Sequence, residues 1–305
     1  MSIYNQNNCP NYDCDGKIKI KYQSVKLDLY NINFNCTTDT YIKPTILECT
    51  KCEIIFSELI NQLNENQFEN NYKEVEDKKY ISQIQYKKIY FENLVKKISK
   101  DVNNEMNVLE IGSYYGVLGS ILNKKFKNYS GLELSTHGSN YSKNIFGLNI
   151  YNETVEQHSQ REKKYDLIIM ADVIEHFSNP FKVFKIINKL LKKDGKLILT
   201  TFNMDSYYSK ITRKNYHWII PFHLVYFTNN TLQKLGEKIN LKLFKIENDP
   251  RFVSVGYLLE KLELIFPKLN FLFNLFNKIK FIKKFTIRVN LRDLNIYYFK
   301  KNNEN

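Results

Sequence analysis

The sequence Asn107-Val-Leu-Glu-Ile-Gly112-Ser-Tyr-Tyr-Gly116 begins as a buried β-strand and turns at its glycines into a helix. Gly112 allows the backbone to turn sharply and lie against a ligand, and Gly116 lets the helix start close to the strand. A second strand, Tyr129-Ser-Gly-Leu-Glu133, ends on an acid, about 20 residues beyond the first glycine. This order is typical of a Rossmann-like half, in which the acid accepts hydrogen bonds from both ribose hydroxyls of a nucleoside.

Tyr114 restricts the class of ligand. A dinucleotide-binding turn needs a glycine at this position so that the backbone can approach a pyrophosphate. A tyrosine there favours a nucleoside without phosphates. A turn with a purely structural role is the alternative for this stretch taken alone. The predicted ligand contacts are Glu110, Gly112, Ser113, Tyr114, Gly116 and Glu133.

Later segments continue the alternation of strands and helices. The apolar run Lys164-Tyr-Asp-Leu-Ile-Ile-Met170 predicts a buried parallel strand, which opens onto Asp172-Val-Ile-Glu-His176. A helix from about Phe181 to Leu191 is expected next, followed by a Lys193-Asp-Gly195 turn and a strand from Lys196 to Thr201.

The order and spacing of these motifs resemble the class I S-adenosylmethionine-dependent methyltransferases over about residues 107–246. The resemblance implies a Rossmann-like α/β fold with a seven-stranded sheet whose last strand is antiparallel. It implies S-adenosylmethionine as the cofactor, with Asp172 shaping the site of its methionine end. A Rossmann-type nucleotide-sugar oxidoreductase is the first alternative, and Tyr114 argues against it. The second is a non-catalytic, zinc-bearing scaffold that keeps the cofactor fold.

All five cysteines lie in the first 52 residues, which core packing alone does not explain. Two close pairs predict a structural Zn²⁺ site with ligands Cys9, Cys14, Cys49 and Cys52. The spacer of the first pair is wider than usual, so Cys36 is an alternative to one member of that pair. The other interpretation is a set of reduced thiols packed in a small β-lobe.

The stretches Ile46-Leu-Glu-Cys-Thr-Lys-Cys52 and Asn70-Asn-Tyr-Lys-Glu-Val-Glu-Asp77 are similar to the zinc ribbon of bacterial methyltransferases that modify sugars and polysaccharides. This resemblance implies a small-molecule or glycan acceptor, and more narrowly an oxygen of a sugar in a cell-surface polysaccharide or related pathway. Amino-group methyltransferases of DNA and RNA resemble one another in an Asp/Asn-Pro-Pro-aromatic sequence after strand four. Ala171-Asp-Val-Ile stands there instead, which argues against nucleic acid.

Two histidines are candidates for catalysis. His176 directly follows strand four, at the carboxyl edge where open α/β sheets bind ligands, so it is the first candidate for a general base. Its alternative role, with Glu175, is to orient the next helix. His223 lies in an aromatic loop before Thr228, a predicted helix N-cap. In the resembled family such a loop covers the acceptor pocket, and the alternative for His223 is a packed, structural side chain.

The predicted organisation has four parts: residues 1–57 a cysteine-rich lobe, 58–100 a helical linker or cap, 101–249 the methyltransferase core, and 250–305 a helical insertion with a final antiparallel edge strand. The insertion is rich in large apolar side chains and lysines. It is interpreted either as a lid or dimer surface, or as a basic face over 257–288 that contacts a membrane and a lipid-linked acceptor.

The chain of 305 residues carries a net charge of +13, which is typical of proteins that bind nucleic acid or anionic membranes. Joint enrichment in Lys, Asn, Ile and Tyr explains the charge equally well as the codon bias of an AT-rich genome. No apolar run reaches the length of a membrane span, and the polar start lacks the core of a signal peptide. We therefore expect a cytoplasmic protein, with a peripheral location at the inner membrane face as the alternative.

Overall fold

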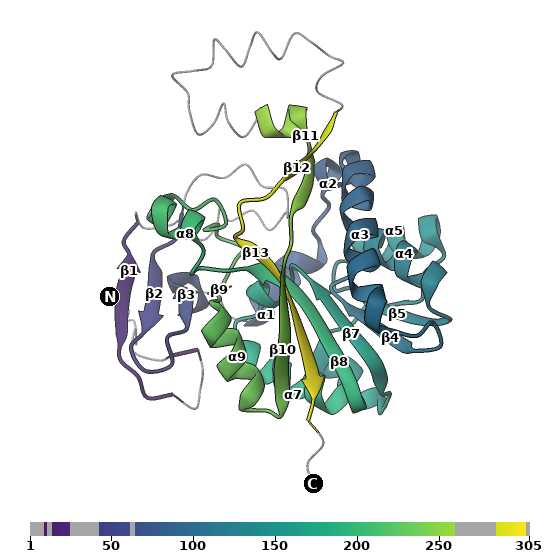
Figure 1. The fold of residues 1–305 in the computed structure, drawn as a ribbon, viewed down its shortest axis with the longest axis horizontal. Helices are drawn as coiled ribbons and strands as arrows, with labels where there is room; N and C mark the ends of the chain where they lie inside the picture. The colour runs from purple at the N-terminus through teal and green to yellow at the C-terminus, as the bar shows by residue number, and fades with distance from the viewer. Residues whose placement is uncertain (1–8, 11–13, 25–42, 62–64, 260–284, 303–305) are drawn as a thin grey trace.

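The computed structural model describes residues 9–10, 14–24, 43–61, 65–259 and 285–302, and its centre is a seven-stranded sheet (Figure 1). The strand order is β10-β13-β8-β7-β4-β5-β6. The bounds are β4 Asn107–Ile111, β5 Asn128–Leu132, β6 Ile150–Tyr151, β7 Tyr165–Ala171, β8 Leu191–Phe202, β10 Leu241–Asn248 and β13 Leu294–Lys301. Strands β4 to β8 run parallel, and β13 is antiparallel to both of its neighbours. The predicted methyltransferase-type sheet with an antiparallel last strand is confirmed.

The middle strands are apolar on both faces because helices cover both. Along β7, Leu167 and Ile169 pack in one core cluster, whereas Ile168 and Met170 pack in the other. This alternation follows from the two-residue period of a strand. A continuous apolar run in the sequence is therefore what a doubly covered parallel strand requires.

Two helical layers flank the sheet (Figure 1). One layer contains α3, α4 and α5, and the other contains α6, α7 and α9. The bounds are α3 Ile84–Ile98, α4 Val117–Lys125, α5 Thr136–Phe146, α6 Val155–His158, α7 Pro180–Leu190 and α9 Asn229–Glu237. Thr228 caps α9 as predicted, since its hydroxyl accepts the backbone N–H of Thr231. Helix α2 (Lys78–Ser82) precedes α3, and Gln83 lies between the two helices.

The prediction that the last strand lies at the edge of the sheet is wrong. Strand β13 is inserted between β8 and β10, and β10 is the edge. Residues Leu294–Phe299 are all buried, because Ile296 and Tyr298 face one helical layer while Tyr297 and Phe299 face the other. Along β10, by contrast, only Leu241 is buried, and partly buried and exposed residues largely alternate after it. Successive side chains of β13 therefore point to two buried faces, and their pattern in the sequence does not mark an exposed edge strand.

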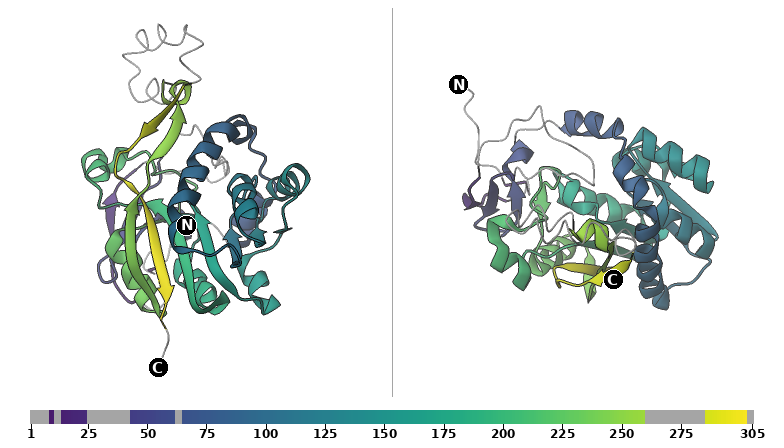
Figure 2. Two further views of the ribbon diagram at one scale, coloured as in Figure 1. Left: turned by 45° about the vertical axis from the view of Figure 1, so that its right-hand side comes forward. Right: turned by 90° about the horizontal axis from the view of Figure 1, so that it is seen from above.

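A second sheet combines the amino-terminal lobe with a piece of the core. Its order is β1-β2-β3-β9, with bounds β1 Ile18–Tyr22, β2 Ile46–Cys49, β3 Ile55–Ser57 and β9 Val225–Tyr226. The view from above in Figure 2 places its purple strands across the molecule from the α3–α5 layer. Because β9 comes from the loop after β8, the lobe is joined to the core by backbone hydrogen bonds.

The segment after β10 forms a hairpin of β11 (Arg251–Ser254) and β12 (Thr286–Val289), which projects beyond the end of the sheet (Figure 2). Residues 255–259 are helical. Most of the predicted helical insertion lies in 260–284, outside the described residues. Among the residues described, no helix has both the length and the apolar character required to cross a bilayer. The remaining helices are α1 (Glu65–Lys73), α2 and α8 (Tyr207–Thr212).

Candidate active site

The turn after β4 has the backbone geometry that the sequence predicts. Gly112 and Gly116 adopt φ values of 74° and 73°, in the left-handed region that glycine tolerates. A Cβ at Gly112 would lie 2.6 Å from the Val173 side chain, so the close approach of the two loops also requires glycine. The N–H groups of Gly112 and Ser113 both donate to the Leu132 carbonyl, at 2.9 Å each. The turn is therefore fixed to the end of β5, next to Glu133.

Glu133 is buried and linked to this turn. One carboxylate oxygen accepts the Tyr114 N–H and the other accepts the Ser135 N–H, both at 2.6 Å. Burial raises the pKa of Glu133 to about 7, against the opposing effect of these hydrogen bonds. Each oxygen has a second lone pair. The Tyr72 side chain and the Leu134 backbone also hydrogen-bond this carboxylate, so the two ribose hydroxyls of a bound nucleoside would share or replace these donors.

The Ser113 hydroxyl gives independent evidence that a polar ligand fits here. It is buried and has no hydrogen-bond partner among the described residues. A buried unpaired hydroxyl is costly, and such atoms in native proteins call for an explanation. Because Ser113 lies on the same turn as Tyr114, a bound nucleoside would supply the missing partner. The residues present thus fit the cofactor that the sequence predicts.

Glu110 has a different environment from the other predicted cofactor contacts. Its carboxylate accepts the Tyr129 hydroxyl at 2.5 Å, and burial raises its pKa to about 8. The Tyr129 hydroxyl lies directly beneath α4, where a Cβ on Gly119 would meet it at 2.2 Å. The Glu110 side chain therefore connects β4, β5 and α4, and we expect it to support the glycine turn from below.

The segment that covers this turn, residues 72–80, overlaps the stretch that resembles the zinc ribbon and the predicted helical linker or cap. The Asp77 N–H donates to the Tyr115 hydroxyl at 2.7 Å, and the Tyr114 hydroxyl donates to the Asp77 carboxylate at 3.2 Å. The Ser135 hydroxyl donates to the Val75 carbonyl. The segment thus bonds to both sides of the Glu133 environment. Its acidic Val75-Glu-Asp77 sequence was visible, but its contact with a turn more than 30 residues later was not.

Asp172 lies at the carboxyl end of β7 and is paired with a residue that sequence analysis missed. Its two oxygens accept a bidentate pair of hydrogen bonds from Arg251, both at 2.7 Å, and one also accepts the Thr200 hydroxyl. Burial would raise the pKa of Asp172, but the Arg251 charge outweighs it and holds the pKa below its ordinary value. Arg251 in turn stacks on Tyr90, with its guanidinium carbon 4.2 Å from the ring centre. Asp172 is therefore a fixed carboxylate in a folded network.

The structure brings His176 and His223 together, with ring centres 5.0 Å apart. The Nδ1 of His176 faces the Phe222 carbonyl at 3.0 Å, and the Nδ1 of His223 faces the Trp218 carbonyl at 2.8 Å. Each Nδ1 must donate its proton to that carbonyl, so each ring is held in one orientation. Burial lowers the pKa of His176 to about 4 and that of His223 to about 3. Both rings are neutral at physiological pH.

Glu175 completes this group. Its carboxylate accepts the Thr201 hydroxyl, and burial followed by the charge of Asp172 raises its pKa to about 8. One ligand-type atom from each of Glu175, His176 and His223 lies within 4.8 Å of the others. This arrangement is compatible with both roles considered for His176: a general base for the acceptor, or, together with Glu175, a residue that orients α7.

The segment from residue 216 to 224, here called the histidine loop, forms an aromatic wall around His223. Phe202 and Trp218 stack with an interplanar angle of 16°, and their ring centres lie 5.1 and 5.9 Å from that of His223. Asp293, just before β13, accepts hydrogen bonds from both the Tyr216 hydroxyl and the Trp218 ring N–H. The histidine loop is thus a packed structure: Phe202 of β8 is fully buried behind it, whereas Trp218 is partly exposed next to the two fixed imidazoles.

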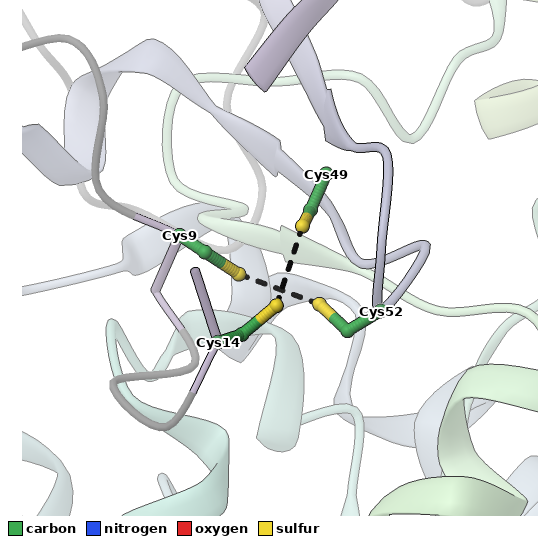
Figure 3. A group of neighbouring side chains, drawn as sticks. All are labelled: Cys9, Cys14, Cys49 and Cys52. Carbon is green, nitrogen blue, oxygen red and sulfur yellow. Dashed lines mark hydrogen bonds between the residues drawn. The ribbon is translucent and has the colours of Figure 1, made fainter. Parts of the chain in front are cut away.

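The four predicted zinc ligands also converge (Figure 3). The sulfurs of Cys9 and Cys52 lie 3.3 Å apart, those of Cys14 and Cys49 lie 3.6 Å apart, and all four are within 4.8 Å of one another. Four sulfurs around one Zn²⁺ at about 2.3 Å would be separated by about 3.8 Å, so an ion fits with small shifts. None of these four cysteines forms a disulfide. Cys36 lies outside the described residues, and the other four already supply a complete tetrahedral set.

Comparison with known proteins assigns the fold and the geometry to a family. A model described as a methyltransferase domain matches residues 80–246, more than half of the chain. Malonyl-[acyl-carrier protein] O-methyltransferase 2 of Ilyobacter polytropus is 28% identical over 116 residues, which cover 36% of this chain and 44% of that protein. Ubiquinone biosynthesis O-methyltransferase of Erwinia tasmaniensis is 28% identical over 105 residues, covering 32% and 43%. The chain spans less than half the length of these curated relatives.

Solved structures agree in fold. A SAM-dependent methyltransferase from Archaeoglobus fulgidus superposes with a TM-score of 0.52 at 16% identity, covering 74% of this chain and all of that one. A second, from Thermotoga maritima, gives a TM-score of 0.50 at 17% identity and covers 77% and 98%. With the family match over the glycine turn, Glu133 and the strand-four exit, these findings show that the chain belongs to the class I S-adenosylmethionine-dependent methyltransferases.

Proposed function

We propose that this methyltransferase transfers a methyl group to an oxygen of a small molecule or glycan, most specifically a sugar hydroxyl in a cell-surface polysaccharide or a related pathway. The observation that carries the proposal is the pair of fixed, neutral imidazoles beside the stacked rings of Phe202 and Trp218. The partly exposed Trp218 ring can hold the apolar side of a ring-shaped acceptor, and a neutral imidazole accepts a hydroxyl proton. Two relatives are named as O-methyltransferases, which supports oxygen as the acceptor atom.

Cofactor binding is assigned to the glycine turn. Glu133 would accept the two ribose hydroxyls, while Gly112, Ser113, Tyr114 and Gly116 would line the nucleoside. S-adenosylmethionine supplies a methyl group on a sulfonium when bound. The residues of the chain contribute alignment, which is worth about 7–11 kcal/mol when two reactants are held in the productive geometry. Asp172, already paired with Arg251, would shape the methionine end through its fixed orientation.

His176 and His223 are the proposed catalytic residues. Each ring faces a backbone carbonyl with Nδ1, so Nε2 is the nitrogen that carries the lone pair. The role of that nitrogen is to accept the hydrogen bond, and then the proton, of the acceptor hydroxyl. A positioned acid or base typically contributes about 10²–10⁴-fold to the rate.

The four-cysteine site is proposed to hold a structural Zn²⁺. A closed set of four thiolates leaves no open position for a substrate, which is typical of structural zinc. The support is the convergence of four sulfurs from two short segments that are otherwise far apart in the sequence.

A lipid-linked acceptor is kept as part of the proposal because of the segment 257–288. The described end of that segment includes Phe285, whose side chain is 51% exposed, and the exposed Arg288. An exposed aromatic ring next to a cation is suited to the interface of an anionic membrane.

The experiment that tests the function is a transfer assay with methyl-labelled S-adenosylmethionine. The acceptor panel contains nucleotide sugars, soluble oligosaccharides, lipid-linked oligosaccharides, a primary amine series and single-stranded RNA. We expect label on a sugar-containing acceptor and none on RNA, with activity lost in Glu133→Ala. Transfer only to amines would contradict the O-methyl assignment. Tight cofactor binding with no transfer to any acceptor would favour a non-catalytic scaffold.

A further inference from the structure

The cysteine lobe and the histidine loop are parts of one sheet. Strand β3 of the lobe pairs with β9, with Ile55 opposite Tyr226 and Phe56 opposite Val225. The Ser57 N–H donates to the Leu224 carbonyl at 2.8 Å, directly after His223. The carboxyl end of the histidine loop is therefore held by the backbone of the lobe.

The other end of the histidine loop is held by the same lobe. The Lys43 ammonium donates to the Tyr216 carbonyl at 2.6 Å. Lys43 lies three residues before β2, whose last residue is the proposed zinc ligand Cys49. Both ends of a loop of nine residues are thus fixed to a segment of the chain that begins more than 150 residues earlier.

A shared apolar core reinforces these hydrogen bonds. Ile46 of β2 and Ile55 of β3 are buried in one cluster with residues of β8, β9, β13 and the histidine loop. The members from outside the lobe are Phe202, Met204, Tyr216, Ile219, Tyr226 and Leu294. Displacement of β2 or β3 would therefore expose the surface against which the histidine loop packs.

The turn of residues 49–54, here called the cysteine knuckle, sets the position of β3 relative to β2. Cys49 ends β2, and its N–H donates to the Ile54 carbonyl while its carbonyl accepts the Glu53 N–H. Glu53 has a φ of 61° and bonds to Asn230 and Lys234 of α9, the helix that follows the histidine loop. Cys52 lies within the knuckle. Any ion held by Cys49 and Cys52 would fix this turn, and the turn fixes the start of β3.

The histidine loop passes this constraint to the strand-four exit. The Leu224 N–H donates to the Glu175 carbonyl at 2.8 Å, and the Phe222 carbonyl faces the Nδ1 of His176. The continuous path is therefore the cysteine knuckle, β3, Leu224, and then both histidines.

We infer that the metal ion held by the four cysteines positions His176 and His223, so that His223 adopts the orientation needed to bind the acceptor only when the four cysteines hold that ion. This inference rests on the proposed zinc site and deepens the proposed function. The four cysteines are positioning residues, since no hydrogen bond or ring contact of the described residues joins them to the glycine turn or to the histidine rings. The hydrogen bonds identified among the described residues do not join the cofactor side, built from β4, β5 and the segment 72–80, to the lobe. The cofactor side contacts the histidine loop where Tyr72 stacks on Phe222, with ring centres 5.7 Å apart.

Trp218 allows a direct test, because it is the only tryptophan of the chain and lies within the histidine loop. Its emission and its quenching by acrylamide are measured on the full-length protein before and after zinc removal with a chelator, alongside zinc content. Binding of S-adenosylhomocysteine is measured by calorimetry on the same samples. We expect zinc removal to shift Trp218 emission to longer wavelength and increase quenching while S-adenosylhomocysteine affinity is kept, and added Zn²⁺ to reverse the change.

Single substitutions separate the effect of the metal ion from the effect of the contacts between the lobe and the histidine loop. Cys49→Ser should show the shifted emission permanently, whereas Cys36→Ser, the matched control, should keep both zinc and the wild-type emission. Lys43→Met should shift the emission without loss of zinc, because it removes only the bond to the Tyr216 carbonyl. Purification without zinc, loss of zinc in Cys36→Ser, or a Trp218 signal that ignores zinc removal would each overturn the inference. So would a complete loss of S-adenosylhomocysteine binding, since that indicates global unfolding and not the smaller effect that the Tyr72–Phe222 contact could transmit. Failure of the methyltransferase proposal is separate, because it would appear as absent cofactor binding in the loaded wild type.

Discussion

The pKa of Glu133 predicts that cofactor affinity depends on pH. Ribose hydroxyls bind the ionised carboxylate, but burial raises the pKa of this acid to about 7 in the free protein. Below pH 7 the carboxyl is protonated and must lose its proton before the ligand binds. With a pKa of about 7, the ionised fraction falls about tenfold from pH 8 to pH 6, so affinity should fall by the same factor, about 1.4 kcal/mol.

The assay is isothermal titration of S-adenosylhomocysteine between pH 5.5 and 8.5. Glu133→Gln should weaken binding by about 1.5–3 kcal/mol, the range for hydrogen bonds to a charged group, and should remove the slope with pH. Glu110→Gln is the matched control, because that acid is also buried but bonds to Tyr129, and its variant should keep the slope. Equal affinity at pH 6 and pH 8 in the wild type would refute the assignment of Glu133 as the ribose ligand.

Three further outcomes are expected. Metal analysis of the purified protein should find about one Zn²⁺ per chain, and the Cys49→Ser variant should lack it. Structural zinc contributes about 10–16 kcal/mol in small zinc fingers, so a metal-free protein with an intact amino-terminal lobe would contradict the site. His176→Gln or His223→Gln should lower turnover by about 10²-fold at saturating cofactor with little change in cofactor affinity. The wild-type rate, also measured with cofactor kept saturating at each pH, should not fall between pH 8 and pH 6, because burial holds the imidazole pKa values at about 4 and 3; a fall in that range would assign the base elsewhere. Arg251→Met should destabilise the fold by about 1–3 kcal/mol in urea unfolding, because the partly exposed Asp172 and the buried Asp249 lose their cation, whereas Arg292→Met, at an exposed position, should not.

The parts of the site that could be predicted are those encoded locally. Gly112 and Gly116 are required by backbone angles within one turn, and Glu133 follows at the end of the next strand. The cysteine set could be predicted for a similar reason, since the members of each pair are close in the sequence. In each case the chemistry depends on spacing within a few residues, which the sequence displays directly.

Long-range partners could not be predicted in the same way. Arg251 reaches Asp172 across 79 positions, and Lys43 reaches Tyr216 across 173. A charged residue in a sequence normally indicates a solvated side chain, and nothing nearby marked these two as partly buried donors. Strand β9 has only two residues, too few for any period to be visible. The position of β13 was misjudged because a two-residue period does not tell whether the second face meets water or another helix.

The low basicity of the two histidines bears on the order of bond changes. An imidazole with a pKa of about 4 cannot remove a proton from a free hydroxyl, which is a far weaker acid. As the acceptor oxygen forms its bond to the methyl carbon, however, its proton becomes strongly acidic, and even a weak base then accepts it. Proton transfer would therefore follow carbon–oxygen bond formation. Before that point, the main contribution of His176 and His223 is to orient a lone pair of the acceptor oxygen toward the methyl carbon. Orientation of this kind depends on Nδ1 contacts to the Phe222 and Trp218 carbonyls, so the histidine loop is as important to the chemistry as the imidazoles themselves.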